Sequence, residues 1–449
     1  MRPVESDKKV VGQRLWSRLL RIVDHPDLLR RVAGSGLIRE SATYISGNIL
    51  IRSIPFLLLP VLTRYLSPED FGRVTMFAIG VSMVAPLVGL STDSAISRQY
   101  FERDTIDFSN YVTNCLYVMA ASLAVLLPIA IALSGQLGAA LALPPAWIWL
   151  LVVMAAARYI GNVTVVAWQV RHQPRPYAVY LFLQTLTVFG ISIVLVVVLR
   201  FGWRGRVAGE TAALLAFAVV GLVVLTRAGW IRHGFNKSHV RHAVSFGTGI
   251  VIHLYGSLLV IAADRFFLTH MLDVGQTGLY AVGAQVAMII GVLEHSFNQA
   301  WSPWLFGRLK NGRRSDLTLI RRITAVYTGV IIGLALLLWL VTPYFLPLLV
   351  GKAFAGASQF VLWLALGNAF SGMYKMAVNQ IFYMNRTDLL AVITVISGVV
   401  NLCLNYLLIS RNGAVGAAQA TAATFFLSYV LTYLLSRRVT RSLYASFSD

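Results

Sequence analysis

The chain has 449 residues, of which 57% are hydrophobic and only 12% are charged, and its mean hydropathy is +0.71. A soluble globular protein carries about 25% charged residues, so this composition excludes a soluble domain and predicts an all-α polytopic membrane protein. The formal net charge of +20 does not require a nucleic-acid partner, because no segment resembles a nucleic-acid-binding module. Orientation in the membrane and attraction to anionic membrane lipids account for the excess of basic residues.

The first 42 residues predict a basic, amphipathic tail on the cytoplasmic side. Residues 14–23 place Arg14, Arg18 and Arg21 on one side of a helix and Leu15 and Leu19 on the other. This run is too short and too charged for the apolar region of a cleavable signal. We expect it to lie along the inner leaflet, with a partly disordered basic tail as the alternative.

A spanning helix needs about 20 mostly apolar residues, and twelve segments meet this requirement. They lie near residues 43–65, 72–94, 110–133, 146–168, 177–199, 206–226, 243–269, 277–299, 323–346, 357–382, 388–409 and 414–436. The sequence therefore predicts two six-helix lobes, with a cytoplasmic linker between them and a cytoplasmic tail at the end. The expected boundaries are 1–42 for the first tail, 43–226 for the N-lobe, 227–242 for the linker, 243–436 for the C-lobe and 437–449 for the last tail.

The distribution of basic residues predicts that both termini are cytoplasmic. With the amino terminus inside, 27 of the 38 Lys and Arg residues fall in cytoplasmic segments, seven fall outside and four lie within spans. This is the positive-inside bias of membrane proteins. The connections are short, and those on the outer side leave no room for a globular domain.

The two halves of the chain repeat each other weakly. Residues 62–66 (Leu-Thr-Arg-Tyr-Leu) precede Gly72, and 206 positions later residues 268–272 (Leu-Thr-His-Met-Leu) precede Gly278. A second match, offset by 208, links residues 205–212 with residues 413–420. Internal repeats of six spans are typical of transporters that rock one half against the other. We expect Gly72 and Gly278 to be equivalent, on the same side of the membrane, in halves related by rotation about the membrane normal.

Basic residues inside the spans are the strongest functional signal. Such residues cost about 2.5–3.5 kcal/mol on insertion scales and usually face a cavity or a partner. Arg52, Arg158, Arg265 and Lys375 lie on four different spans, and Arg98 lies at the cytoplasmic end of the second. They predict a cationic lumen for an anionic, phosphate-bearing substrate, because the guanidinium group binds phosphate oxygens through two parallel hydrogen bonds.

Arg52 is the strongest candidate among these bases. It lies seven to nine residues into the first span, which places it roughly 10–14 Å below the cytoplasmic surface at 1.5 Å per residue. The positions one turn away on its own helix hold Asn48, Ile49, Pro55 and Phe56, none of which is an acid. We therefore expect its guanidinium to face the space between the lobes.

Four acids at membrane depth are the alternative partners of these bases and the candidates for ion coupling: Asp93, Glu210, Asp264 and Glu294. Simple pairing, such as Arg265 with Glu210 or Lys375 with Glu294, is the structural alternative to a substrate role. Asp264 and Arg265 are adjacent, so on a helix they point in different directions, and at least one should find a partner on another helix.

The sequence contains no nucleotide-binding loop, no two-histidine zinc motif and no nucleophile elbow. Asparagine, glutamine and aromatic side chains within the spans suit sugar contacts, although helix packing explains them equally well. We expect no enzyme activity, no cofactor and no metal.

The order of several motifs resembles a known family. These are residues 62–72 (Leu-Thr-Arg-Tyr-Leu-Ser-Pro-Glu-Asp-Phe-Gly), Asp264-Arg265, residues 278–280 (Gly-Leu-Tyr), residues 401–405 (Asn-Leu-Cys-Leu-Asn) and residues 413–421. From about residue 41 to residue 437 the chain is similar to bacterial polysaccharide flippases. They form the oligosaccharide-lipid branch of the multidrug/oligosaccharidyl-lipid/polysaccharide exporter superfamily.

This resemblance implies a MATE-like, V-shaped carrier of two pseudo-symmetric lobes in the bacterial cytoplasmic (inner) membrane. It implies transport of an undecaprenyl-diphosphate-linked oligosaccharide from the inner to the outer leaflet for polysaccharide biosynthesis, by alternating access. Partners would be the lipid-linked oligosaccharide and the polysaccharide polymerase or export machinery. The alternatives are a multidrug or organic-cation antiporter, a peptidoglycan-precursor flippase with typically more spans, and a scaffold for an export complex.

Overall fold

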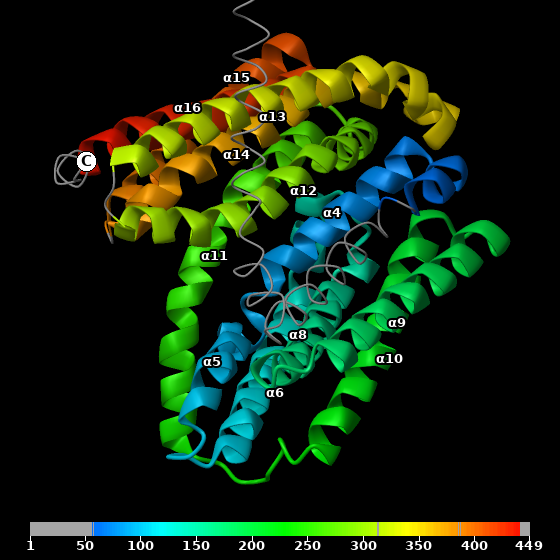
Figure 1. The fold of residues 1–449 in the computed structure, drawn as a ribbon. Helices are drawn as coiled ribbons and strands as arrows, with labels where there is room; N and C mark the ends of the chain where they lie inside the picture. Colours follow the sequence, from blue (N-terminus) through cyan, green and yellow to red (C-terminus); the bar gives the residue numbers. More distant parts are fainter. Residues whose placement is uncertain (1–55, 57, 312–313, 385, 387, 441–449) are drawn as a thin grey trace, which may run out of the picture.

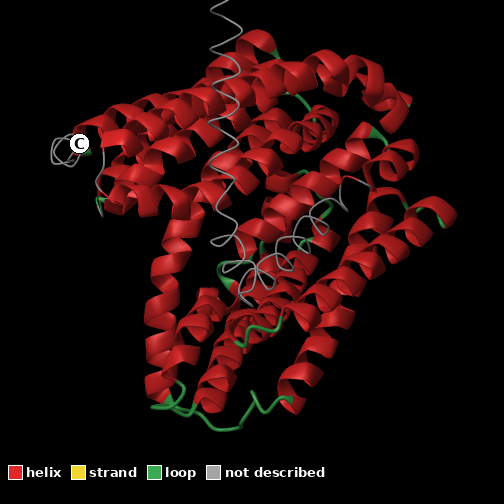
Figure 2. Cartoon of the chain, in the orientation of Figure 1, coloured by secondary structure: helices red, strands yellow, loops and turns green. Residues whose placement is uncertain are grey.

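The computed structural model describes residues 56, 58–311, 314–384, 386 and 388–440. Within these residues every regular element is helical (Figures 1 and 2). Arg52, most of the predicted first span and the amphipathic tail lie outside the described residues, so the expectations about them stay predictions.

The helices follow the predicted spans closely. In the first half they are α4 (Pro68–Val84), η1 (Val88–Ser91), α5 (Thr92–Gln99), η2 (Tyr100–Glu102), α6 (Phe108–Ala132), α7 (Ser134–Leu141), η3 (Pro145–Trp147), α8 (Trp149–Val170), α9 (Pro174–Ile193), η4 (Val194–Val198) and α10 (Gly202–Arg227). In the second half they are α11 (Lys237–Met271), α12 (Val274–Asn311), α13 (Arg314–Leu349), η5 (Lys352–Ala357), α14 (Ser358–Tyr383), α15 (Asp388–Asn412) and α16 (Ala414–Val439).

Nine of the described helices are long and apolar enough to cross a membrane, or ten if the bent pair formed by residues 68–84 and 88–102 is one span. Helix α11, of whose side chains only part is described, is not among them. The predicted count of twelve spans is therefore not confirmed, whereas the multi-pass helical character is.

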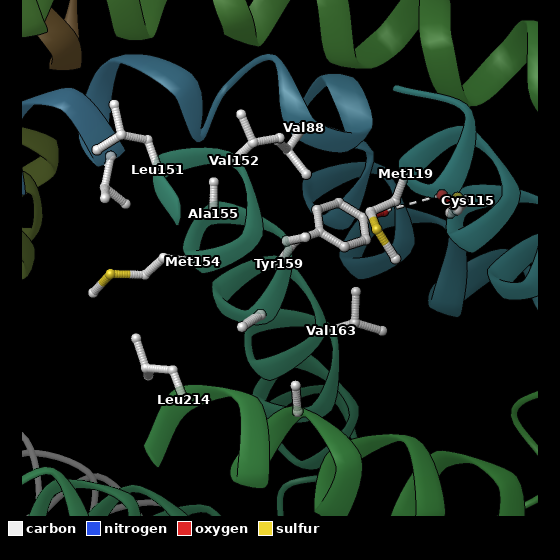
Figure 3. Packing of buried hydrophobic residues seen from close by; sticks show 14 of the residues in the cluster. Val88, Cys115, Met119, Leu151, Val152, Met154, Ala155, Tyr159, Val163 and Leu214 are labelled. Atoms are coloured by element: carbon white, nitrogen blue, oxygen red, sulfur yellow. Dashed lines mark hydrogen bonds between the residues drawn. The ribbon is translucent and has the colours of Figure 1, made fainter. Parts of the chain in front are cut away.

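Each half has its own apolar core. In the first half, α6, α8 and α10 surround buried residues such as Cys115 and Val163. Figure 3 shows Tyr159 of α8 directed toward Cys115 and Met119 of α6, and its hydroxyl donates a hydrogen bond of 3.4 Å to the Cys115 carbonyl oxygen. A separate core in the second half lies among α12, α13, α14 and α16. A third cluster joins the halves, with Leu59 and Phe71 packed beside Val286 and Phe354, and the predicted lobe boundaries stay a prediction.

The two bundles meet where α4 crosses α12, close to the start of both helices (Figure 1). A side chain at Gly72 would collide with the Val274 carbonyl oxygen, and one at Gly278 would collide with the Pro68 carbonyl oxygen. Positions 68 and 274 are also 206 residues apart. The contact of Gly72 with residue 274 is therefore the repeat equivalent of the contact of Gly278 with residue 68. The prediction that the two glycines lie on the same side and at equivalent places is confirmed.

We expect the change Gly278→Ala to destabilise the protein by about 1–3 kcal/mol, because the added methyl group would push the α4 and α12 backbones apart. Gly329→Ala on α13 is the matched control, since nothing lies within 4 Å of a side chain at that position. Thermal unfolding of both purified variants measures the difference. Equal unfolding temperatures for the two variants would show that the glycine contact is dispensable.

The second span is broken between α4 and α5. The two segments are bent by 61°, and the backbone at Gly89, Leu90 and Ser91 has positive φ angles of 73°, 50° and 53°. Pro86 has no backbone N–H, which favours an interruption just after α4, and Gly89 adopts positive φ without steric cost. The Ser122 hydroxyl accepts the Gly89 N–H at 2.8 Å. The break places the start of α5, with Asp93 in its first turn, inside the N-terminal bundle.

Helix α11 joins the two bundles. Near the middle of the helix, the Tyr255 hydroxyl donates a 2.5 Å hydrogen bond to the Met83 carbonyl oxygen of α4. Near its end, Asp264 accepts hydrogen bonds from α12 and α16. Figure 1 shows α11 running from beside α5 and α6 up to the second bundle. The domain boundary predicted at residues 242 and 243 stays a prediction, because one helix packs against both halves.

Candidate functional site

A polar cavity of about 400 Å³ lies inside the first bundle, on the side covered by α11. Its wall includes the break after α4, one face of α8 and residues of α9, and Leu254 and Leu258 of α11 close it. Polar and charged side chains line it at Asp93, Ser94, Arg158, Asn162 and Gln184. Of the candidate site residues predicted from sequence, the structure brings Asp93 and Arg158 together in this cavity.

Asp93 reaches the cavity because the second span is interrupted. Its Oδ2 atom lies 3.5 Å from Asn162 Nδ2, at the limit of a hydrogen bond. Within the described part of the chain, Asp93 forms no ion pair within 4.0 Å. A carboxylate in a cavity at membrane depth without a basic partner is suited to take up a proton or a cation.

Arg158 faces the same cavity from α8 and is held by an acid. Its Nη2 atom lies 3.0 Å from Glu210 Oε1 on α10, and Arg206 Nη2 lies 3.0 Å from Glu210 Oε2. Arg206 also donates a 3.1 Å hydrogen bond to Ser192 Oγ of α9. Two bases share one acid, so the cluster carries one net positive charge beside the cavity.

Asp264 is the centre of a buried network in the second bundle. It is only 2% exposed, and Tyr280 and Thr421 each donate a 2.6 Å hydrogen bond to its Oδ2 atom. Asn405 donates a 3.0 Å hydrogen bond to Oδ1, and Arg265 Nη1 lies 3.7 Å from Oδ2. The Arg265 guanidinium also lies 5.1 Å from the Tyr280 ring centroid, a cation–π contact.

Two expectations about Asp264 and its neighbour have different outcomes. Asp264 finds partners on α12, α15 and α16, as predicted for one member of the adjacent pair. Although adjacent residues point in different directions on a helix, Arg265 Nη1 also comes within 3.7 Å of Asp264 Oδ2, because the arginine side chain is long, and this contact was not predicted. The suggested pairing of Arg265 with Glu210 was wrong, since Glu210 contacts Arg158 and Arg206 in the other bundle.

Lys375 forms the pair that the sequence suggested. Its Nζ atom lies 2.6 Å and 2.9 Å from the two carboxylate oxygens of Glu294, joining α14 to α12. One turn further along both helices, Asn379 Nδ2 donates a 2.8 Å hydrogen bond to Asn298 Oδ1. These contacts cross-link two helices within the second bundle.

Arg98 lies in the last turn of α5 and pairs with Glu102, four residues later in η2. Their Nη2 and Oε1 atoms are 3.3 Å apart, and both side chains are about half exposed. The structure does not bring Arg98, Arg265 and Lys375 into the cavity that holds Arg158. No group of three or more His, Cys, Asp or Glu residues that could hold a metal ion occurs within the described ranges.

Sequence reasoning missed several members of these clusters. Arg206 was counted with the outer charges, although its spacing of four residues from Glu210 is the signal for a pair on one helix face. Tyr280 and Thr421 were recognised only as parts of family-like motifs. Their role as donors to Asp264 depends on how α11, α12 and α16 pack, which no local spacing reveals.

Residues 37–308 match the sequence family described as polysaccharide biosynthesis protein. Two curated relatives come from Haemophilus influenzae. One is an uncharacterized membrane protein, 26% identical over 381 residues, which are 82% of this chain and 89% of the relative. The other is the Lsg locus putative protein 1, 25% identical over 379 residues, which are 81% of this chain and 89% of the relative.

Solved structures show the same fold at low sequence identity. The inward-facing conformation of a MATE family multidrug resistance transporter has a TM-score of 0.73 and 12% identity, over 88% of this chain and 96% of that one. The inward closed conformation of the lipid II flippase MurJ has a TM-score of 0.68 and 13% identity, over 90% of this chain and 93% of that one. The expected all-α, MATE-like, V-shaped fold is thus confirmed.

Proposed function

We propose, from the premise that this chain belongs to the polysaccharide biosynthesis protein family, that it flips an undecaprenyl-diphosphate-linked oligosaccharide across the bacterial cytoplasmic membrane. The observation that carries the proposal is the family match over residues 37–308 in a chain with the fold of MATE transporters and MurJ. The carrier would expose its binding site to each side in turn, with both termini in the cytoplasm. Polysaccharide polymerase or export machinery would receive the product.

Among the five basic candidates, Arg158 and Arg52 are the first candidates for binding the diphosphate. Arg158 faces the cavity, and its cluster with Glu210 and Arg206 retains one net positive charge. Arg98, Arg265 and Lys375 also remain candidates, but each has an acid within 4.0 Å. In the buried pairs, a base that moves from its acid to the substrate would leave that acid buried without a counter-charge, at a cost of about 3–5 kcal/mol. Arg98, which is half exposed, would leave its partner more easily but lies at the cytoplasmic mouth.

The change Arg52→Ala should abolish polysaccharide export while leaving protein level and membrane insertion intact. Arg52→Lys should restore only part of the activity, because it returns the charge without the two-pronged guanidinium geometry. Surface polysaccharide in a complemented deletion strain, with immunoblotting of membranes, measures both effects. Normal export by the alanine variant would remove Arg52 from the binding site.

Asp93 is the first candidate for ion coupling among the four acids at membrane depth. Glu210 and Glu294 are held by bases, and Asp264 is held by three neutral donors and Arg265. No base lies within 4.0 Å of the Asp93 carboxylate among the described residues, and Asn162 is the side chain that contacts it, so uptake of a proton or a cation would break no ion pair. We therefore assign the coupling role to Asp93 ahead of Glu210, Asp264 and Glu294.

An organic-cation antiporter is the second candidate function, and Asp93 in the cavity is the residue that favours it. A carboxylate in a cavity suits a cationic drug, and several of the similar solved structures are MATE transporters. Arg158 in the same cavity argues against a cationic cargo, because like charges repel.

A deletion strain separates the two functions. Loss of surface polysaccharide, with lipid-linked oligosaccharide accumulating on the cytoplasmic leaflet, is expected for the flippase. Unchanged polysaccharide together with increased sensitivity to cationic drugs would instead identify an antiporter.

A further inference from the structure

The second bundle contains a larger groove that none of the roles above uses. Its volume is about 1550 Å³, and it lies among α13, α14, α15 and α16. Helix α14 packs against both α13 and α16 and forms the floor, where Met376 and Ala377 are buried. The lining residues come from the start of α13 and α15 and from the last turns of α14 and α16. In the predicted topology all four of these ends are cytoplasmic.

The mouth of the groove is basic. Arg321 extends from α13, and Arg437 and Arg438 extend from the last turn of α16. All three are exposed, and none has a carboxylate within 4.0 Å among the residues that the structure describes. The Arg437 guanidinium lies 5.8 Å from the Tyr433 ring centroid, which holds it beside the groove.

Aliphatic and polar side chains both line the groove. Val392 and Ile396 of α15 and Leu434 of α16 line it, yet they are 57%, 44% and 54% exposed. The Ser436 hydroxyl donates a 3.0 Å hydrogen bond to Gln380, and Thr324 Oγ1 is buried without a hydrogen-bond partner among the described residues. The groove therefore offers an apolar surface for an acyl chain together with its basic mouth.

We propose that this groove binds an anionic phospholipid of the cytoplasmic leaflet. The phosphate would lie against Arg321, Arg437 and Arg438, the ester region would lie at the level of Thr324, and an acyl chain would cover Val392, Ile396 and Leu434. Basic residues next to a membrane surface attract anionic headgroups, and the aliphatic side chains of the groove contact an acyl chain through van der Waals packing. The lipid would bridge α13 and α16 across the floor formed by α14.

The chemistry of the groove selects this occupant over the cargo. The oligosaccharide of a lipid-linked substrate needs many hydrogen-bonding groups, whereas the lining residues furthest from the helix ends are Thr328, Met373, Ile396 and Tyr429, which offer only two hydroxyl groups. The groove lies in the second bundle, and the cavity with Asp93 and Arg158 lies in the first. The lipid site therefore does not depend on the proposed transport function.

Native mass spectrometry of the purified full-length protein tests the site with two defined lipids, phosphatidylglycerol and phosphatidylcholine. We expect the wild type to retain phosphatidylglycerol preferentially. The triple change R321Q/R437Q/R438Q should weaken its binding by about 100-fold, since each of the three basic residues near the surface contributes about 5-fold. The matched control R175Q/R227Q/R241Q removes three exposed charges of the first bundle and its connections, and it should bind like the wild type.

A second variant and two competitors make the test specific. Ala325→Trp fills the groove from an exposed position on α13 without changing charge, and it should also reduce retention. Millimolar inorganic phosphate should not displace the lipid, because the acyl chain contributes to binding. Equal loss in both triple variants, or unchanged retention in Ala325→Trp, would overturn the proposal. Preferential retention of an added polyprenyl diphosphate would assign the groove to the cargo instead.

Discussion

The change Asp93→Asn is expected to abolish polysaccharide export without reducing the amount of folded protein. The carboxylate lies in the polar cavity of the first bundle, and Asn162 is 3.5 Å away. Asparagine has nearly the same shape and keeps the contact with Asn162, but it can neither take up a proton nor attract a cation. Because the change breaks no ion pair among the described residues, stability should alter little.

Export and thermal unfolding together measure this prediction. Asp104→Asn is the matched control, since Asp104 is an exposed acid in the connection that follows the same span. Asp93→Glu should retain part of the activity, because the charge remains while the carboxylate moves by one methylene group. An Asp93→Asn variant that exports as well as Asp104→Asn would exclude a coupling role for this residue.

The change Glu210→Gln should produce the largest loss of stability, about 3–5 kcal/mol. Glu210 holds Arg158 and Arg206 at 3.0 Å each, and without its charge two guanidinium groups would face each other in a partly buried site. Chemical or thermal unfolding of the purified protein measures the loss. Glu102→Gln is the control, because Glu102 is half exposed and contacts Arg98 and Gln99, and exposed ion pairs contribute about 0–1 kcal/mol.

The double change E210Q/R206Q tests the physical cause. It removes one acid and one base, so the cluster returns to a single net positive charge, and it should recover part of the stability lost in Glu210→Gln. If the double variant is as unstable as the single one, repulsion between Arg158 and Arg206 does not explain the loss.

The helical segments could be read from the sequence because they depend on local composition. Runs of about 20 apolar residues predict spans whatever their neighbours are, and eleven of the twelve predicted segments coincide with described helices. The break at Gly89 was not predicted. Pro86 and Gly89 permit an interruption there, but the apolar run continues to Leu90, and the packing of Tyr159 and Ser122 against Gly89 is not visible in the sequence.

The site was predictable in its residue types but only partly in its contacts. Lys375 with Glu294 was proposed correctly, because few charged residues lie within the predicted spans of the second half and an acid at membrane depth needs a base. Arg265 was given the wrong acid, since charge counting carries no information about which bundle a side chain enters. The equivalence of Gly72 and Gly278 followed from the repeat, whereas the close approach of α4 and α12 at these glycines was not predicted.

A further copy of the same repeat was overlooked. Gly161-Asn162 on α8 and Gly367-Asn368 on α14 are also 206 residues apart. The two asparagines have diverged in role, because Asn162 faces Asp93 in the cavity whereas Asn368 donates to the Ala287 carbonyl oxygen at 3.3 Å. The repeat thus extends to α8 and α14, while the polar cavity lined by Asp93 and Arg158 belongs to the first half.

The most direct measurement of the proposed function follows a lipid-linked oligosaccharide in proteoliposomes. Undecaprenyl-diphosphate oligosaccharide is placed in both leaflets, and a glycosidase or lectin that cannot cross the membrane reports the accessible fraction over time. With the wild-type protein, accessibility should rise from about half to nearly all of the substrate, and with Asp93→Asn it should stay near half. Equal accessibility with and without the wild-type protein, under an imposed ion gradient as well as without one, would contradict the assignment as a flippase.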